Sequence, residues 1–142
     1  VIVGPHEFEG NGTIVCDVAV GGIGPVNTPV TITVRDGRAV DVECKDSGVR
    51  TRVTEALATD TMASHIGEFA FGLNPKARNV EEFVETEKLG GTVHIAFGNN
   101  IDYPGGRNDS MNHMDFLMSA PDVRAYFGDE CVEVMKGGKW SI

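Results

Sequence analysis

Two histidines and two carboxylates in the second half of the sequence are of the types that bind metal ions. His113 and Asp115 are separated by one residue, so in an extended strand their side chains point to the same side. His94 and Glu68 each stand in a short apolar segment. Imidazole nitrogens and carboxylate oxygens suit Zn, Mn, Co or Fe(II) better than Ca or Mg. The residue types therefore predict a metal-site domain.

Glu68 and His94 also have simpler explanations when each is taken alone. A buried Glu68 without a partner would cost several kcal/mol, which a metal or a cation offsets, but Glu68 could also face water from an edge strand. His94 could be a hydrogen-bonded core histidine. Glu68 and His94 are each a polar residue in an apolar strand, and their occurrence together with His113 and Asp115 favours the metal site.

Composition narrows the class of protein. The 142 residues suffice for one domain, and no apolar run approaches the roughly 18 residues of a membrane span. The formal charge of −9, with scattered Lys and Arg, would repel phosphate backbones. We expect no nucleic-acid partner and no membrane, whereas a metal or an amine-bearing substrate is compatible with the charge.

The three cysteines do not form a zinc motif. Cys16, Cys44 and Cys131 are odd in number, far apart and without C-x-x-C spacing. We expect free, mostly buried thiols in a reducing compartment, which predicts a cytoplasmic protein.

The pattern of apolar residues predicts an α+β fold. Alternation in residues 13–19, 29–34 and 39–44 indicates antiparallel strands, with Asp36-Gly37 as a hairpin turn. Residues 47–66 have helical spacing, and a second helix is expected over 80–89, with Asn79 as its N-cap and its charges facing solvent.

The candidate ligands fall on the strands that follow. Buried strands are expected over residues 67–72 and 91–98, and a third over 112–119 after a long irregular loop. The tail predicts a closing hairpin, with strands over 123–126 and 131–135 and a turn over 127–130. The fold class is therefore α+β, a mainly antiparallel, partly barrel-like sheet with about two packed helices.

Several segments together resemble the M29 family of metallo-aminopeptidases (the aminopeptidase T, or thermophilic aminopeptidase, family). They are Gly67-Glu68, then Gly91-Thr92-Val93-His94-Ile95-Ala96-Phe97-Gly98-Asn99, a Gly-rich loop, and His113-Met114-Asp115. The resemblance spans most of the chain and corresponds to the C-terminal half of the family's sequence. It implies an aminopeptidase with a two-metal centre of Zn, Co or Mn, a peptide substrate and a homodimer.

The resemblance also implies the roles of individual residues. Glu68, His94, His113 and Asp115 are the candidate ligands, and Glu68 could instead act as the general base. The family tends to have a tyrosine shortly after the His-Ile-Ala segment, where this sequence has Ile101 at the nearest spacing and Tyr103 two residues later. Tyr103 is therefore the second candidate catalytic residue.

A further ligand of the family, a Glu in a Gly-Glu-Val segment, precedes the part that this chain matches. We therefore expect residues 1–142 to be a single metal-binding C-terminal domain of a longer chain, with the N-terminal domain absent. The isolated chain is then expected to be inactive, or to be a non-catalytic dimerisation or half-site module. A related branch resembles Fe(II)-dependent ring-cleaving dioxygenases, and two histidines with a carboxylate also suit that chemistry.

Overall fold

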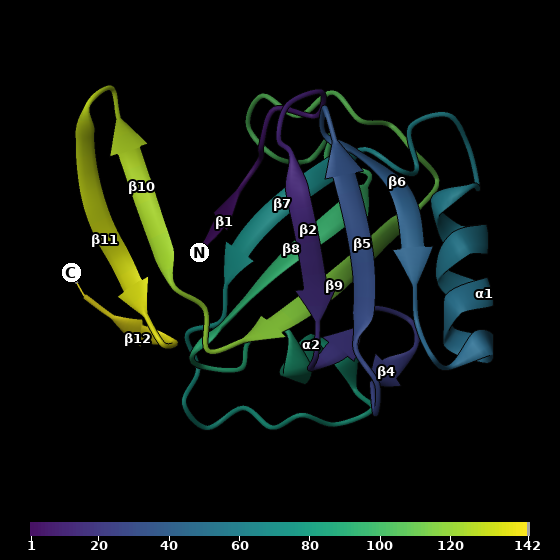
Figure 1. Ribbon diagram of the computed structural model, residues 1–142, viewed down its shortest axis with the longest axis horizontal. Helices are drawn as coiled ribbons and strands as arrows, with labels where there is room; N and C mark the ends of the chain where they lie inside the picture. Colours follow the sequence, from purple (N-terminus) through teal and green to yellow (C-terminus); the bar gives the residue numbers. More distant parts are fainter. Residues whose placement is uncertain (142) are drawn as a thin grey trace.

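The structure is a computed structural model that describes residues 1–141, and it is built mainly from antiparallel sheets (Figure 1). The larger sheet has the strand order β1–β7–β8–β9–β3–β4, and a second sheet has the order β2–β5–β6. These strands are β1 (Ile2–Val3), β2 (Gly12–Cys16), β3 (Ala19–Val20), β4 (Gly24–Pro25), β5 (Val30–Arg35), β6 (Arg38–Glu43), β7 (Ile66–Phe71), β8 (Thr92–Gly98) and β9 (His113–Ser119). The α+β prediction is confirmed, and among residues 1–141 the sheets do not close into a barrel.

The main core lies between these two sheets. Alternate residues of β5 are buried, as its period-two pattern predicts. Phe97 of β8 and Phe116 of β9 meet them from the larger sheet, with ring centroids 5.8 Å apart. Neighbouring residues of a strand face opposite ways. Ala96 next to Phe97, and Asp115 next to Phe116, therefore face away from the core. The second face of the larger sheet is thus available for a site.

The first predicted hairpin is confirmed. β5 pairs with β6 through Asp36 and Gly37, which have φ of 48° and 71°. Positive φ at both central residues matches the right-handed twist of the strands, and Asp-Gly tolerates it well.

The first helix is shorter than predicted. α1 spans Ser47–Leu57, with the Asp46 carboxylate accepting the backbone N–H groups of Gly48 and Val49. Residues 58–64 form turns and bends instead of helix, and the Asp60 carboxylate accepts the Met62 N–H within them. The apolar stripe therefore does not continue as helix to Ile66, which opens β7.

The second predicted helix is reduced to one turn. α2 spans Phe83–Thr86, and Glu82, not Asn79, is its N-cap. The Asn79 amide instead donates to the Val18 carbonyl, 3.4 Å away. The buried Thr86 hydroxyl accepts from the Val80 N–H, which holds the preceding residues outside the helix.

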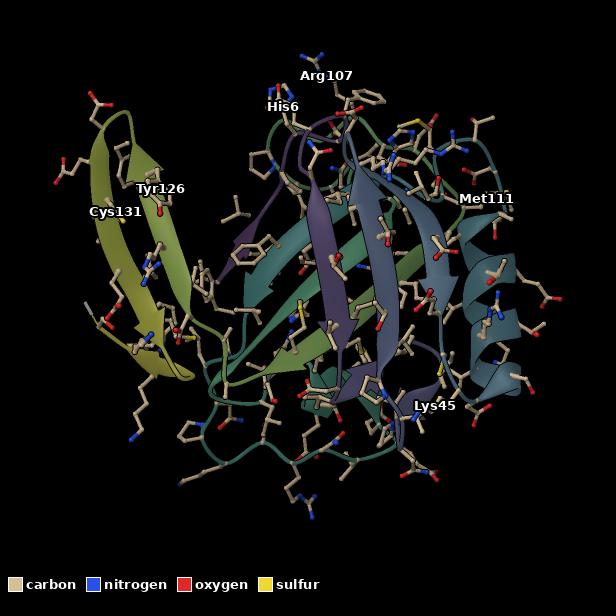
Figure 2. The ribbon with its side chains drawn as sticks, viewed as in Figure 1. His6, Lys45, Arg107, Met111, Tyr126 and Cys131 are labelled. Atoms are coloured by element: carbon tan, nitrogen blue, oxygen red, sulfur yellow. The ribbon has the colours of Figure 1, made fainter. Side chains whose placement is uncertain are left out.

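The chain ends in a β-ribbon that stands apart from the main body (Figure 1). Its strands are β10 (Val123–Phe127), β11 (Glu130–Lys136) and β12 (Lys139–Trp140), which confirms the closing hairpin. Figure 2 places Tyr126 and Cys131 on this ribbon. Cys131 is exposed and Cys44 is half-buried, so the expectation of mostly buried thiols is wrong for these two cysteines. Cys16 is buried, which raises the pKa of its thiol to about 12, and all three cysteines are free.

No helix of the described part of the chain is both long and apolar enough to cross a membrane.

Candidate metal centre

Strand register brings the four predicted ligands to one face of the larger sheet. Glu68 of β7, Ala96 of β8 and Asp115 of β9 lie opposite one another, and residues paired in this way share a face. His94 lies two residues along β8 and His113 two residues along β9, so both project from the same face. The methyl group of Ala96 is the only side chain between the two carboxylates in this row.

A β-bulge at Gly67 turns Glu68 toward the site. The register shifts between Ile66, which pairs with Phe97, and Glu68, which pairs with Ala96. Ile66 consequently packs against the core, whereas Glu68 faces the opposite side two residues later. Only glycine fits at the bulge, because a Cβ there would lie 2.2 Å from the Gly98 carbonyl oxygen.

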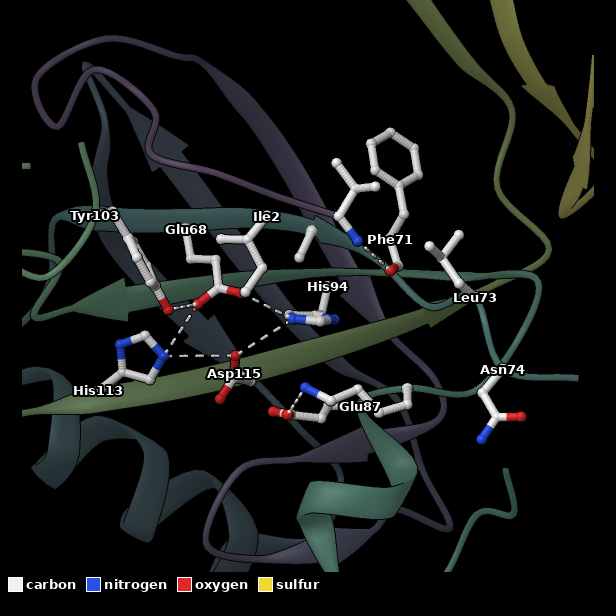
Figure 3. A pocket seen from close by; sticks show the side chains of 13 residues that line it. Ile2, Glu68, Phe71, Leu73, Asn74, Glu87, His94, Tyr103, His113 and Asp115 are labelled. Atoms are coloured by element: carbon white, nitrogen blue, oxygen red, sulfur yellow. Dashed lines mark hydrogen bonds and ion pairs between the residues drawn. The ribbon is translucent and has the colours of Figure 1, made fainter. Parts of the chain in front are cut away.

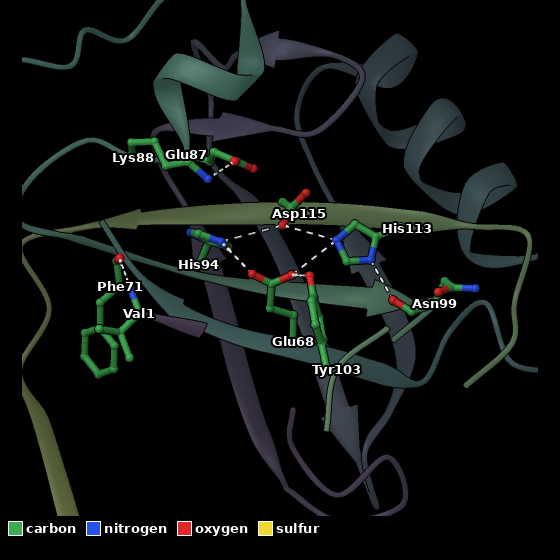
Figure 4. Close-up of polar contacts among 10 residues, drawn as sticks. All are labelled: Val1, Glu68, Phe71, Glu87, Lys88, His94, Asn99, Tyr103, His113 and Asp115. Carbon is green, nitrogen blue, oxygen red and sulfur yellow. Dashed lines mark hydrogen bonds and ion pairs between the residues drawn. The ribbon is translucent and has the colours of Figure 1, made fainter. Parts of the chain in front are cut away.

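The acidic and basic groups meet at short distances (Figure 4). His94 Nε2 lies 3.1 Å from Glu68 Oε1 and 3.8 Å from Asp115 Oδ1. His113 Nε2 lies 3.4 Å from Glu68 Oε2 and 3.7 Å from Asp115 Oδ1. One ligand atom from each of Glu68, His94 and Asp115 lies within 4.8 Å of the other two. Two nitrogens and two carboxylates thus converge on one small volume.

Hydrogen bonding selects the nitrogen that His113 presents to this cluster. Its Nδ1 lies 2.8 Å from the backbone carbonyl of Asn99, which can only accept, so Nδ1 carries a proton and Nε2 faces the carboxylates. Bonds to Asp115 and then to Glu68 raise the pKa of His113 to about 10. Such a carbonyl partner is typical of metal-bound histidines.

The alternative of a water-facing glutamate does not describe this geometry, whereas His94 is buried and hydrogen-bonded to Glu68, as the alternative of a core histidine also expects. Glu68 is only 3 % exposed, and β7 lies between β1 and β8 rather than at the sheet edge. His94 is buried, and within residues 1–141 its Nδ1 has no hydrogen-bond partner. Its interactions are all on the Nε2 side, with two carboxylates. The donor set fits a divalent cation shared by these groups.

Tyr103 belongs to the same cluster. Its hydroxyl donates to Glu68 Oε2 at 2.6 Å, whereas Ile101, at the spacing of the family's tyrosine, is exposed. Burial alone raises the pKa of Glu68, but hydrogen bonds from His113, His94 and Tyr103 outweigh it and hold the pKa well below its ordinary value. Burial and the bond to Glu68 raise the pKa of Tyr103. At neutral pH the pair is a carboxylate and a neutral phenol.

The cluster opens into a cavity of about 440 Å³ (Figure 3). Ile2, Phe71 and Leu73 form an apolar part of its wall. Glu87 and Lys88, predicted as a solvent-facing part of a helix, also line it and form an ion pair with each other. This volume is typical of small-molecule sites.

The other two histidines lie outside the cluster. His65 Nδ1 lies 3.2 Å from the Glu7 carbonyl, and its ring meets the edge of Phe8. His6 is in an exposed loop.

Three contributors to the geometry of the site were not identified from sequence, namely Ala96, the bulge at Gly67 and the carbonyl of Asn99. Of these only the glycine carries a visible signal, since an isolated glycine in a strand often marks a bulge.

A known protein family matches the chain over almost its whole length. The family model described as thermophilic metalloprotease (M29) matches residues 1–140. The chain belongs to the M29 family. No curated protein sequence matches the chain significantly.

Two solved structures share the fold. Wild-type AmpT from Thermus thermophilus matches with 25 % identity and a TM-score of 0.81, over 99 % of this chain and 39 % of that one. A 2,5-dihydroxypyridine dioxygenase from Pseudomonas putida KT2440 matches with 18 % identity and a TM-score of 0.78, over 98 % of this chain and 42 % of that one. The M29 chain therefore spans about two fifths of the length of these structures.

Proposed function

We propose that the full-length protein containing this M29 chain is a metal-dependent aminopeptidase, which hydrolyses N-terminal residues from peptides. The observation that carries the proposal is the convergence of two imidazole Nε2 atoms and two carboxylates beside the Tyr103 hydroxyl, within one cavity. Membership of a metalloprotease family supports the same chemistry.

In this proposal Glu68, His94, His113 and Asp115 hold a divalent metal, with Zn, Co or Mn as candidates. When bound, such an ion supplies Lewis acidity, which lowers the pKa of water and polarises a peptide carbonyl. The Asn99 carbonyl fixes the ring of His113 so that Nε2 faces the centre. Glu68, kept ionised by its surroundings, either ligates the metal or accepts the proton of the attacking water.

The cavity supports a peptide substrate bound by its amino end. In this proposal Glu68 and Asp115 are shared with the metal and Glu87 is paired with Lys88, so the α-amine of the peptide would be anchored at the metal. The apolar wall of Ile2, Phe71 and Leu73 could contact the first side chain of the peptide. From the cysteine usage we also propose a cytoplasmic protein, and from the family resemblance a homodimer in which residues 1–142 form the C-terminal metal-binding domain.

Replacement of Glu68 tests the proposal. In the metal-loaded full-length protein, Glu68→Gln is expected to abolish peptide hydrolysis while circular dichroism and the melting profile remain those of a folded protein. Glu9→Gln is the matched control, because Glu9 is an exposed carboxylate elsewhere in the chain. Retained turnover in Glu68→Gln would remove Glu68 from the mechanism.

A ring-cleaving Fe(II) dioxygenase is the second candidate. The fold is shared with the Pseudomonas putida enzyme, and two histidines with one carboxylate also suit Fe(II). Elemental analysis and anaerobic reconstitution separate the aminopeptidase from the dioxygenase, because iron content with substrate-dependent oxygen uptake is expected only of the dioxygenase.

We further propose that the isolated chain is a half-site without activity. Hydrolysis of peptides by residues 1–142 alone would contradict this proposal.

A further inference from the structure

The loop that carries Tyr103 is fixed by an unusual number of buried polar groups. Asn100, Asn108 and Ser110 lie between β8 and β9, and each is at most 5 % exposed. Asn108 N–H donates to the Asn100 side-chain oxygen at 2.8 Å, and Asn100 N–H donates to the Asn108 carbonyl at 2.9 Å. The two asparagines thus close the loop at its base. Such satisfied polar networks specify one conformation.

A buried carboxylate from a distant part of the sequence holds this base. Glu7, which is 4 % exposed, accepts the Asn100 side-chain amide at 3.1 Å and the Arg107 N–H at 2.7 Å, both on Oε1. Burial alone raises the pKa of Glu7, but these bonds and its own backbone N–H bring the pKa below its ordinary value. Glutamates are seldom buried without a specific reason, and no part of the proposed chemistry uses this one.

The connection from Glu7 to the metal centre is short. The Asn100 carbonyl accepts the Tyr103 N–H at 2.9 Å, and the Tyr103 carbonyl accepts the Gly106 N–H, also at 2.9 Å. Glu7 therefore binds both ends of the turn whose apex carries Tyr103. The Tyr103 side chain then reaches Glu68 Oε2 at 2.6 Å.

We propose that Glu7 is a positioning residue, which acts through Asn100 and Arg107 to hold the Tyr103 hydroxyl against Glu68. This inference rests on the proposed aminopeptidase function for its kinetic part only. Glu7 itself touches neither the candidate ligands nor the substrate cavity among the contacts of residues 1–141. Its effect is therefore expected on turnover rather than on metal binding.

Steady-state kinetics of the full-length, metal-loaded protein test this route. Glu7→Ala is expected to lower kcat roughly tenfold or more with KM changed less than about threefold, because small displacements of positioned groups have such costs. Glu7→Gln keeps an acceptor oxygen and is expected to retain activity within about threefold of the wild type. Glu9→Ala, which removes an exposed carboxylate two residues away, is the control and should have no effect.

A double-mutant cycle separates positioning from general destabilisation. In a Tyr103→Phe background, Glu7→Ala is expected to have little further effect on kcat, because the hydroxyl it positions is gone. An equal loss in both backgrounds would overturn the proposal. Should Glu7→Ala not fold, Glu7→Asp replaces it, since this variant keeps the charge and shortens the reach by one methylene.

Hydrogen exchange provides a readout that needs neither metal nor activity. In metal-free full-length protein, Glu7→Ala should speed exchange of the amides of residues 100–107 and leave those of β8 and β9 unchanged. Unchanged exchange in the loop would overturn the inference, even if the protein proves to be a peptidase. Absence of peptidase activity in the wild type, with exchange altered as expected, would refute the proposed function and leave the role of Glu7 in fixing the loop intact.

Discussion

Removal of the Tyr103 hydroxyl should reduce turnover by an amount that its hydrogen bond allows us to estimate. The hydroxyl lies 2.6 Å from Glu68 Oε2, within the range of bonds between a hydroxyl and an ionised acceptor. Hydrogen bonds to charged groups contribute about 1.5–3 kcal/mol. At about 1.4 kcal/mol per factor of ten, Tyr103→Phe should lower kcat about 10- to 150-fold if the bond is fully used in the transition state.

The assay is steady-state peptide hydrolysis at saturating metal, with metal affinity measured in parallel by calorimetry. Tyr103→Phe should leave metal affinity within about threefold of the wild type, because Tyr103 is not among the candidate ligands. The substitution removes only one hydrogen bond to Glu68. Tyr126→Phe is the matched control, since the only other tyrosine of the chain is 67 % exposed on the terminal ribbon. Unchanged kcat in Tyr103→Phe, or an equal loss in Tyr126→Phe, would refute the reasoning.

Three further predictions concern the sheet and the buried carboxylates. Ala96→Val should place methyl groups between the carboxylates of Glu68 and Asp115 and destabilise the fold by about 1–3 kcal/mol. Calorimetry should show Zn²⁺ binding weakened about tenfold or more. Ala125→Val, on the terminal ribbon, is the control and should not weaken binding. Gly67→Ala should also lose Zn²⁺ affinity, because the added Cβ meets a carbonyl at 2.2 Å and shifts the bulge; wild-type affinity would show that the bulge does not set Glu68. The pKa of Glu7 is lowered on folding, so the unfolded state binds protons more readily, and the stability this group provides should be lost below about pH 5. Urea unfolding of the metal-free protein between pH 7 and 3 measures this, and a Glu7→Gln variant with an undiminished pH dependence would contradict it.

The strands that carry the site could be predicted because short apolar segments bounded by glycines or turns are a local property of the sequence. The segments around His94 and His113 became β8 and β9, and the separation of His113 and Asp115 by one residue placed both on one face. The face of Glu68 could not be derived in this way. It depends on a bulge, and a bulge is decided by how closely Gly67 approaches the neighbouring strand.

Helix lengths were predicted poorly because polar side chains at their ends are used in long-range contacts. Asp60 accepts hydrogen bonds from the Ser110 hydroxyl and the Met111 N–H, about fifty residues away, so its turn replaces the last part of the expected helix. Thr86 shortens the second helix through nearer partners, since its hydroxyl binds the backbone of residues 78–82, just before the helix. Local propensity cannot include such partners, and the same holds for Glu7 and the Tyr103 loop.

The most direct test of the metal centre is a crystal structure of the full-length protein grown with Zn²⁺, Co²⁺ or Mn²⁺, with anomalous data collected on both sides of the metal's absorption edge. We predict an anomalous peak bounded by His94 Nε2, His113 Nε2 and the carboxylates of Glu68 and Asp115. A fully occupied metal that contacts none of these four side chains, or their side chains remaining bonded only to one another in the presence of excess metal, would contradict the assignment.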